Sequence, residues 1–337
     1  MAQDVVVSDI PKMPVSGRDY PRTWEQFLDW FPDDDACLEY LEGMRWPSGF
    51  ACPRCGMADE AYRTSRGRLV CRHCRHQCTV TAGTIFEKTR TPLRSWLAAV
   101  WYIVNQKQGV NALGLQRVLG LGSYQTAWTM LHRLRRAMIR PGRERLSGVV
   151  EVDECFVGHT PRQKKPAKKM GKRSIKQEDS GNTVIAVAVE IKLTKGFGRI
   201  RMGRIAAPSQ VALMPFIKDA IEPGSIVHTD GSAAYRSLSK NGYRRKRTVM
   251  YGNEKPAHIS MPGVNRVASL LKRWLLGTHQ GAIRPQQLDH YLDEFVFRFN
   301  RRTSRSRGLL FYRLLEQAML TDPVTYAQIA AKGKHNI

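Results

Sequence analysis

The sequence lacks any hydrophobic run long enough to cross a membrane. Its longest uninterrupted apolar stretch, residues 96–104, has nine residues, whereas a membrane-spanning helix needs about 20. The N-terminus is polar and acidic, without the apolar segment of a secretory signal peptide. From these features we expect a soluble, cytoplasmic protein with no membrane partner.

The sequence has few cysteines, and their number is odd. The 337-residue chain has seven cysteines, which argues against a framework of paired disulfides and indicates a reducing compartment. Four of the seven form two Cys-x-x-Cys pairs, Cys52 with Cys55 and Cys71 with Cys74. Such pairs are typical of a metal site.

Acidic residues are scarce after residue 50. Residues 1–50 carry 10 of the 29 Asp and Glu but only 4 of the 54 Lys and Arg, which leaves 19 acids and 50 bases on residues 51–337. An excess of this size indicates a polyanionic partner, for which nucleic acid is the default. A basic protein without such a partner is the less favoured alternative.

The densest basic segment is residues 162–176, with eight Lys or Arg and no acid. This composition predicts a flexible loop. Its lysines Lys164, Lys165, Lys168 and Lys169 are candidate contacts to DNA phosphates. The alternative is a solvated loop with no specific role.

The two Cys-x-x-Cys pairs are separated by 15 residues, enough for a hairpin that brings the pairs together. Four thiolates suit a tetrahedral Zn²⁺ ion. We therefore expect a zinc ribbon over residues 46–82, with Cys52, Cys55, Cys71 and Cys74 as ligands. A site closed by four thiolates has no open position, so the predicted Zn²⁺ is structural and folds a segment too small for its own core.

The two ends of the chain are expected to be helical. Residues 1–45 predict an acidic helical segment, in which residues 33–35 cap a helix. Residues 306–337 predict a C-terminal helical tail.

Residues 90–142 predict three helices, with a glycine turn before the last one. This pattern fits a helix-turn-helix, although other three-helix bundles share it. Tyr124 and Gln125 at the start of the third helix are candidates for base contacts. Three arginines further along the same helix are expected to neutralise phosphates: Arg133, Arg135 and Arg136.

Residues 147–305 have the pattern of an α/β domain. Strands are expected at 149–157, 183–191, 198–206 and 225–230, with a weak one at 246–251, and helices at 209–221, 232–240, 264–276 and 286–301. Three strands in succession, then a helix and a fourth strand, is the order of an RNase H-like core, a mixed sheet with helices. The fold class we predict is therefore multidomain α/β, with this core preceded by a zinc ribbon and a helix-turn-helix.

Two carboxylates and a helical amide suggest a catalytic metal site. Asp153 lies in the first predicted strand and Asp230 ends the fourth. Asn265 and Lys272 are seven residues apart, nearly two helical turns, so they share one face of their helix. Paired Mg²⁺ or Mn²⁺ ions that cleave or join phosphodiesters need such oxygen ligands. The alternative is a set of unrelated polar residues at the ends of elements.

Other polar residues stand close to these positions. Glu151 and His228 each precede one of the two aspartates by two residues, so strand alternation places each on the same face as its aspartate. Either is a candidate to assist the site or is simply packed. Glu154 is expected on the opposite face and is not ranked as a ligand. His258 is a weaker candidate for a hydrogen bond to substrate.

Taken together, these motifs resemble the bacterial insertion-sequence transposases of the ISXO type, which have an N-terminal zinc ribbon and an RNase H-like DDE domain. The resemblance covers roughly residues 25–315. It rests on the double Cys-x-x-Cys motif, Val152-Asp153-Glu154, Thr229-Asp230-Gly231 and residues 265–273. Residues 274–279, 291–295 and 298–302 extend it. The third catalytic position holds Asn where many members have a carboxylate, as in the Asp-Asp-Asn-Lys variants of the family.

The resemblance implies both an activity and roles for the residues. Asp153, Asp230 and Asn265 would be the ligands of catalytic Mg²⁺ (or Mn²⁺), and Lys272 with its neighbour Arg273 would contact substrate DNA. The protein would bind the terminal inverted repeats of its element, cleave the ends and transfer a strand to target DNA. Its partners would be double-stranded DNA and further copies of itself, in a nucleoid-associated assembly.

Two other functions fit parts of the same pattern. One is a DNA-binding regulator that combines the zinc ribbon and helix-turn-helix with a degenerate nuclease domain. The other is an RNase H-like nuclease, such as a resolvase, that cleaves without joining.

Overall fold

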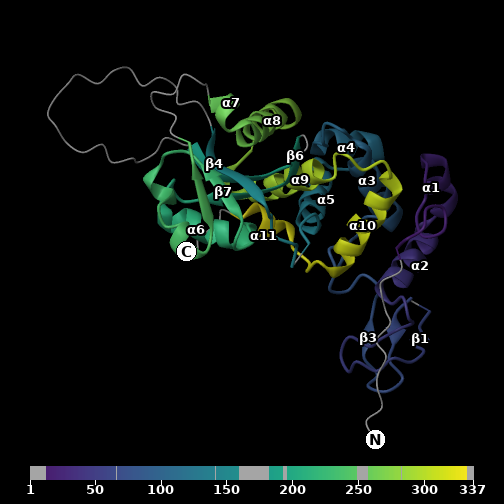
Figure 1. Cartoon of the computed structure of the whole chain (residues 1–337). Helices are drawn as coiled ribbons and strands as arrows, with labels where there is room; N and C mark the ends of the chain where they lie inside the picture. The colour runs from purple at the N-terminus through teal and green to yellow at the C-terminus, as the bar shows by residue number, and fades with distance from the viewer. Residues whose placement is uncertain are drawn as a thin grey trace, which may run out of the picture. The chain divides into compact units, whose positions relative to one another are not determined.

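A computed structural model of the chain describes residues 13–65, 67–140, 142–158, 182–192, 196–248, 257–281 and 283–331 (Figure 1). The chain divides into two compact units, and the segment predicted as a C-terminal tail is shared between them. Unit 1 comprises Met1–Met138 and Ser304–Thr325, and unit 2 comprises Ile139–Thr303 and Tyr326–Ile337. Among the described helices, none has the length and apolar character needed to span a bilayer.

Unit 1 combines a small three-stranded sheet with six helices. The strands are β1 (Tyr62–Arg63), β2 (Leu69–Val70) and β3 (Gln77–Cys78), in the antiparallel order β1-β2-β3. The helices are α1 (Trp24–Trp30), α2 (Asp34–Arg45), α3 (Leu93–Asn105), α4 (Ala112–Leu119), α5 (Tyr124–Ala137) and α10 (Arg307–Leu320). Helix α10 packs against α2, α3 and α5, so residues from both ends of the sequence build one core.

Aromatic rings from distant parts of the sequence fill the core of unit 1. Phe27 lies 5.5 Å from Trp101 and 5.8 Å from Phe311 between ring centroids. Phe31 lies 5.0 Å from Phe27. Ring pairs at these separations stabilise a core beyond their buried area, and they attach α1 and α10 to α3.

The helix ends in unit 1 follow the local sequence. Asp33 accepts a hydrogen bond from the backbone N–H of Ala36 and caps α2, which confirms the predicted cap. Asn111 and Ser123 cap α4 and α5 in the same way. Gly120 ends α4 with φ +61°, a left-handed conformation that favours glycine. The three predicted helices are therefore present, while their action as a helix-turn-helix stays a prediction.

Unit 2 is built on one five-stranded mixed sheet of order β6-β5-β4-β7-β8. The strands are β4 (Val149–Gly158), β5 (Asn182–Ile191), β6 (Phe197–Ile205), β7 (Ile226–Thr229) and β8 (Arg244–Arg247). Strand β5 is antiparallel to both β4 and β6, whereas β7 is parallel to β4 and to β8. Strand β8 therefore begins two residues before the weak strand predicted at 246–251 and ends at Arg247, while residues 249–251 of that prediction lie outside the described residues.

The helices of unit 2 cover both faces of this sheet. They are α6 (Gln210–Ala220), α7 (Ala257–Ser260), α8 (Pro262–His279), α9 (Leu288–Asn300) and α11 (Tyr326–Ala330). The α-helix predicted at 232–240 is wrong: the segment forms two 3₁₀ helices, η1 (Ala233–Tyr235) and η2 (Ser239–Asn241). The Ser232 hydroxyl accepts from the N–H of Ala234 and caps the start of η1.

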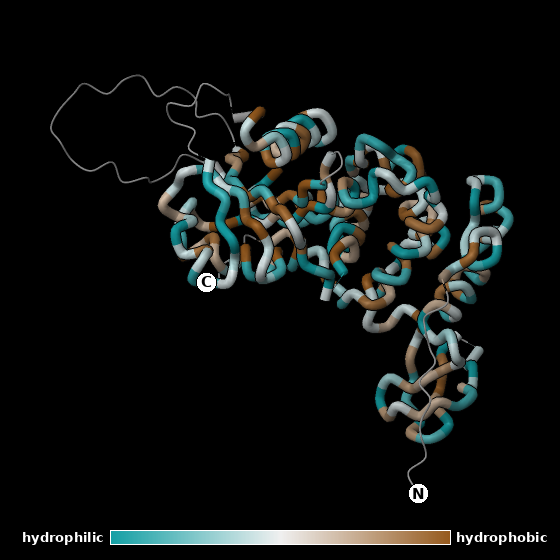
Figure 2. Tube along the Cα trace, in the orientation of Figure 1, coloured by the Kyte–Doolittle hydropathy of each residue, from teal (hydrophilic) through white to brown (hydrophobic). Residues whose placement is uncertain are grey.

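Strand β4 separates two hydrophobic cores. Cys155 joins the core formed with α8 and α9, whereas Val150 and Val152 join the core formed with α6. Figure 1 shows α8 and α6 on opposite sides of the sheet, and Figure 2 shows hydrophobic stretches along its strands. Because side chains alternate along a strand, Glu151 and Asp153 lie on the same face as Cys155, toward α8.

Helix α8 is capped by a side chain of β4. The residue before it, Met261, makes no side-chain cap. Instead, a carboxylate oxygen of Glu151 accepts from the backbone N–H groups of Gly263 at 2.7 Å and Val264 at 3.0 Å. Glu151 is only 3% exposed, so these bonds satisfy a buried acceptor and two donors of the first helical turn. We call this contact the Glu151 cap.

The Glu151 cap leaves no room for a side chain at the start of α8. A Cβ on Gly263 would lie 2.8 Å from both the Glu151 carboxylate and Ile191. Burial raises the pKa of Glu151, although the two N–H groups and Lys246 oppose this. The cap joins strand β4 to helix α8. Asp153 follows Glu151 by two residues on the strand, and Asn265 follows Gly263 by two residues on the helix.

We expect Glu151→Ala to destabilise the protein by about 1–3 kcal/mol, because two buried N–H groups lose their acceptor. Glu151→Gln keeps one carbonyl oxygen for both bonds and should lose less. Urea unfolding followed by circular dichroism measures the difference. Glu222→Ala, on the exposed surface of the same unit, is the matched control. Equal stability of Glu151→Ala and Glu222→Ala would contradict the cap.

Candidate active site and metal centre

The two predicted aspartates lie beside each other on neighbouring parallel strands. Glu151 of β4 pairs with His228 of β7, so the residues two places further on, Asp153 and Asp230, reach the same end of the sheet. Burial raises the pKa of Asp153, and the nearby Asp230 carboxylate raises it further. The tertiary structure therefore brings together two groups that are 77 positions apart in the sequence.

Each of these carboxylates is held by one backbone group. An oxygen of Asp153 accepts from the N–H of Glu154 at 2.8 Å. An oxygen of Asp230 accepts from the N–H of Ser232 at 2.9 Å. These local bonds set the direction of both side chains.

Asn265 and Lys272 come to the same place from α8. Together with Asp153 and Val187 they line a cavity of about 150 Å³. The amide nitrogen of Asn265 donates to the carbonyl of Met261 at 2.8 Å, one turn earlier in the chain. Lys272 is exposed, and its charge acts on Cys155 of β4. The spacing of seven thus places both side chains toward the strand that carries Asp153.

Glu154 is a third carboxylate near the two aspartates. Its pKa is raised to about 7, mainly by burial and also by the charges of Asp153 and Asp230, while the hydrogen bond from Tyr235 opposes the rise. The hydroxyl of Tyr235 donates to Glu154 at 2.9 Å, from the opposite face of the sheet, as the alternation predicts. Glu154 nevertheless lines the same cavity as Asp153. No sequence signal relates Tyr235 to Glu154, which is 81 residues away.

His228 has a structural partner within the sheet. It is only 6% exposed, and its Nε2 lies 2.7 Å from the hydroxyl of Thr248. Burial lowers its pKa, and the charge of Lys246 adds to the effect. His228 therefore packs, as Glu151 does, instead of joining the carboxylates. The side chain of His258 lies outside the described residues.

The carboxylates around the cavity suit a hard metal ion. Oxygen ligands from Asp and amide groups are those that Mg²⁺ prefers. Within the part of the chain that the structure describes, neither Asp153 nor Asp230 forms an ion pair with Lys, Arg or His. A bound cation would relieve the repulsion that raises the pKa of Asp153, so the residues fit the ion.

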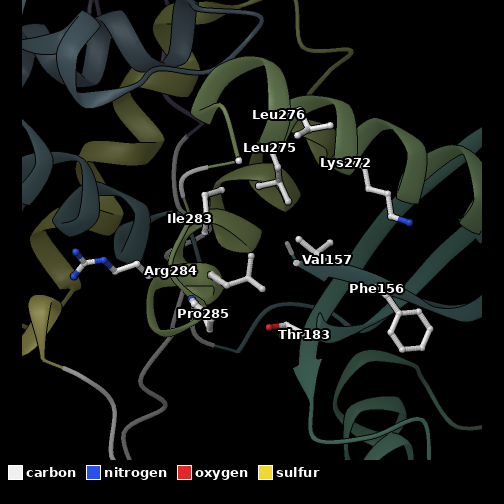
Figure 3. Close-up of a pocket in the computed structure, with 12 residues that line it drawn as sticks. Phe156, Val157, Thr183, Lys272, Leu275, Leu276, Ile283, Arg284 and Pro285 are labelled. Atoms are coloured by element: carbon white, nitrogen blue, oxygen red, sulfur yellow. The ribbon is translucent and has the colours of Figure 1, made fainter. Parts of the chain in front are cut away.

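A larger, mostly apolar hollow adjoins this cavity. It measures about 520 Å³, and Phe156 and Lys272 line both spaces. Figure 3 shows Lys272, Leu275 and Leu276 along one helix, with Phe156 and Val157 on the strand beside it. The candidate site is therefore flanked by this hollow on the side of Lys272.

The residues predicted to contact DNA differ in their exposure. Tyr124 is 54% exposed at the start of α5, and Gln125 beside it is exposed. Lys272 and Arg273 are exposed on α8, and Arg136 is half-buried. Four predicted contacts, Lys164, Lys165, Lys168 and Lys169, lie outside the described residues.

Two of the predicted phosphate contacts donate hydrogen bonds inside unit 1. The expectation of an accessible side chain is wrong for the buried Arg135, whereas Arg133 is half-buried and its contact with DNA stays a prediction. Arg135 is only 2% exposed and donates to the carbonyl of Val110. Arg133 donates to the carbonyls of Val324 at 2.8 Å and Ile85 at 3.1 Å. From the sequence alone, the three arginines of this helix had the same expected role. In the structure, the surrounding loops and α10 cover part of this helix.

The four predicted cysteine ligands come together in unit 1. Their four sulfur atoms, from Cys52, Cys55, Cys71 and Cys74, all lie within 4.8 Å of one another. The Sγ atoms of Cys52 and Cys74 are 3.6 Å apart, and those of Cys55 and Cys71 are 3.7 Å apart. Thiolates about 2.3 Å from a tetrahedral Zn²⁺ would be about 3.8 Å from each other. The geometry fits structural zinc.

A short hairpin brings the two cysteine pairs together. Strands β1 and β2 pair antiparallel, with Arg63 opposite Leu69. Gly67 turns the chain between them with φ +70°, a conformation that favours glycine. Cys78 is buried near this hairpin but is not a member of the cluster.

Two regions of the chain match models of known protein domains. Residues 145–300 match the model of the ISXO2-like transposase domain, and residues 32–77 match the model of the transposase zinc-ribbon domain. The first range contains Asp153, Asp230, Asn265 and Lys272, and the second contains the four clustered cysteines.

One relative aligns with most of the chain. It is described as an uncharacterized protein in transposable element ISH50 of Halobacterium salinarum, and it is 26% identical over 277 residues. The alignment covers 80% of this chain and 91% of the relative. The chain thus carries an ISXO2-like transposase domain over residues 145–300 and a transposase zinc ribbon over residues 32–77, and it is similar to a protein of a transposable element.

Proposed function

We propose that this transposase binds the ends of its element, cleaves them to free a 3′-hydroxyl and joins that hydroxyl to target DNA. The observation that carries the proposal is the convergence of Asp153, Asp230, Asn265 and Lys272 on one end of the sheet of unit 2. The strand order β6-β5-β4-β7-β8, with the second and third strands along the chain antiparallel to their neighbours, is the order we expect of an RNase H-like core.

Asp153 and Asp230 would hold the catalytic Mg²⁺ or Mn²⁺, with the amide oxygen of Asn265 as third ligand. Metal ions bound there would activate the attacking water or 3′-hydroxyl and stabilise the leaving oxygen. Asn265 is neutral and cannot act as a general base, so its part is limited to ligation and orientation. Glu154 lies beside the aspartates and is oriented by Tyr235.

The basic residues of both units would hold the DNA. Lys272 and Arg273 present their charges on the same helix as Asn265, and they would contact the phosphates of the strand being cut. In unit 1, Tyr124 and Gln125 are exposed at the start of α5, where they would contact bases, and Arg136 would contact a phosphate. The zinc ribbon would contribute to recognition of the terminal repeats. Because transposition joins two ends, we propose a homo-oligomer on DNA.

Asp153→Asn should abolish both cleavage and joining, with a loss of at least about 100-fold, because it removes one metal-ligating charge. The measurement uses purified protein, labelled element-end DNA and Mg²⁺ or Mn²⁺, with the products separated on denaturing gels. Asp219→Asn, an exposed carboxylate of the same unit, is the control and should behave as the wild type.

The same assay separates the proposal from its two rivals. Joined products that disappear in Asp153→Asn support a transposase. Cleavage without joining would favour an RNase H-like nuclease such as a resolvase. Binding of element ends without either reaction would favour a regulator and overturn the catalytic proposal.

Asn265→Ala should slow strand joining by more than about tenfold while leaving DNA affinity nearly unchanged, because a lost ligand affects the transition state more than the phosphate contacts. Asn265→Asp restores an oxygen ligand and should keep part of the activity. Rates come from single-turnover joining, and affinities from filter binding in Ca²⁺. Joining by Asn265→Ala at the wild-type rate would remove Asn265 from the site.

Loss of one cysteine ligand should release zinc and unfold the ribbon. Cys55→Ser is expected to reduce bound zinc from about one ion per chain to none and to weaken binding of element ends, because metal binding supplies the folding energy of such small modules. Zinc is measured by atomic absorption. Cys78→Ser, in the same module but outside the cluster, should retain its zinc, and a loss there as large as in Cys55→Ser would refute the four-cysteine assignment.

A further inference from the structure

Strand β8 consists entirely of basic residues: Arg244, Arg245, Lys246 and Arg247. It lies at one edge of the five-stranded sheet. Arg244, Lys246 and Arg247 are exposed, and Arg245 is half-buried. None of the four forms an ion pair with a described acidic residue. We call this strand the β8 basic edge.

Half of this edge lies on the face of the sheet that carries Asp153. Lys246 pairs with His228, which in turn pairs with Glu151, so the three share one row across the sheet. The charge of Lys246 acts on both partners: it lowers the pKa of His228, and it opposes the rise in the pKa of Glu151 caused by burial. Since side chains alternate along a strand, Arg244 lies on this face as well.

On the other face of the sheet, β8 is hydrogen-bonded to the turn that carries Asp230. Arg245 donates to the carbonyl oxygens of Asp230 at 3.3 Å and Ser232 at 3.0 Å. These two residues frame the turn that directs the Asp230 carboxylate. The position of the β8 basic edge is thus set relative to the carboxylates by direct hydrogen bonds.

We propose that the β8 basic edge binds the phosphate backbone of the DNA strand that enters the active site, with Arg244 and Lys246 as the contacts. This inference rests on the proposed DNA-joining function. Residues two apart on a strand are about 6.6 Å from each other, close to the spacing of adjacent phosphates along one DNA strand. Arg can bind a phosphate through two parallel N–H groups, and Lys binds it as a point charge.

Charge complementarity favours this partner. Four cations in four residues repel one another, and a polyanion relieves that repulsion. Lysine on an edge strand also prevents edge-to-edge pairing of sheets. That role alone predicts no change in DNA binding when the charges are removed, so the experiment below distinguishes the two.

The test removes the two contacts in the full-length protein. Arg244→Ala/Lys246→Ala should lower the affinity for element-end DNA and for unrelated DNA by the same factor, about tenfold, because phosphate contacts carry no sequence information. The slope of log affinity against log salt should fall by about 1.8, or about 0.9 for each phosphate contact. Lys218→Ala/Lys240→Ala removes the same charge from exposed positions of unit 2 and should leave the slope unchanged.

A second variant separates charge from fold. Arg244→Gln/Lys246→Gln keeps long side chains on the strand and should give the same reduced slope with a wild-type urea midpoint. If both double variants bind DNA with the slope of the wild type, or if the Lys218→Ala/Lys240→Ala control loses as much as they do, the assignment of this surface is overturned.

The results that would refute the proposed function differ from those that would refute the β8 contact. Wild-type protein that cleaves and joins DNA, together with unchanged binding by the variants, refutes the β8 contact and leaves the function intact. Wild-type protein that binds without cleaving, together with a reduced slope in the variants, refutes the catalytic proposal and retains the contact.

Discussion

A single buried carboxylate, Glu151, joins the central strand of the sheet to the helix that completes the candidate site. Helix α8 has no cap of its own, and the two hydrogen bonds from its first turn to Glu151 define where it begins. A negative charge at this end is also favoured by the helix dipole. Because Asp153 follows Glu151 by two residues and Asn265 follows Gly263 by two, the cap sets the strand residue against the helix residue. Gly263 allows this approach, since a Cβ would collide with Glu151.

The site concentrates negative charge in a strongly basic protein. Asp153, Asp230 and Glu154 influence one another, and burial raises the pKa of both Asp153 and Glu154. Such an arrangement is unfavourable without a cation, and groups with perturbed pKa values of this kind are enriched at functional sites. Lys272 on α8 and Lys246 on β8 lie nearby without forming ion pairs with the aspartates. Acidic groups at the centre with basic groups around them match a metal ion bound together with a polyanion.

Some features could be predicted from the sequence because they depend on residues that are close together in the chain. The Cys-x-x-Cys spacing predicted the cysteine cluster, the seven-residue spacing placed Asn265 and Lys272 on one helix face, and Asp33 predicted its cap. Other predictions were wrong because they depend on residues that are far apart in the chain. Arg135 has the sequence context of a solvated arginine, yet it is buried near Val110. The segment at 232–240 has helical periodicity, but it forms two short 3₁₀ helices.

The sequence by itself determined the kinds of chemistry available: four thiolates for zinc, two aspartates and an amide for a hard cation, and a basic surface for a polyanion. Only the tertiary structure decided which of these groups meet. The parallel pairing of β4 with β7 brings Asp153 to Asp230, the Glu151 cap brings α8 to the same strand, and the position of β8 places a basic edge beside them. The physical reason is that residue spacing specifies directions only within one helix or strand, whereas contacts between elements depend on packing and hydrogen bonds over the whole unit.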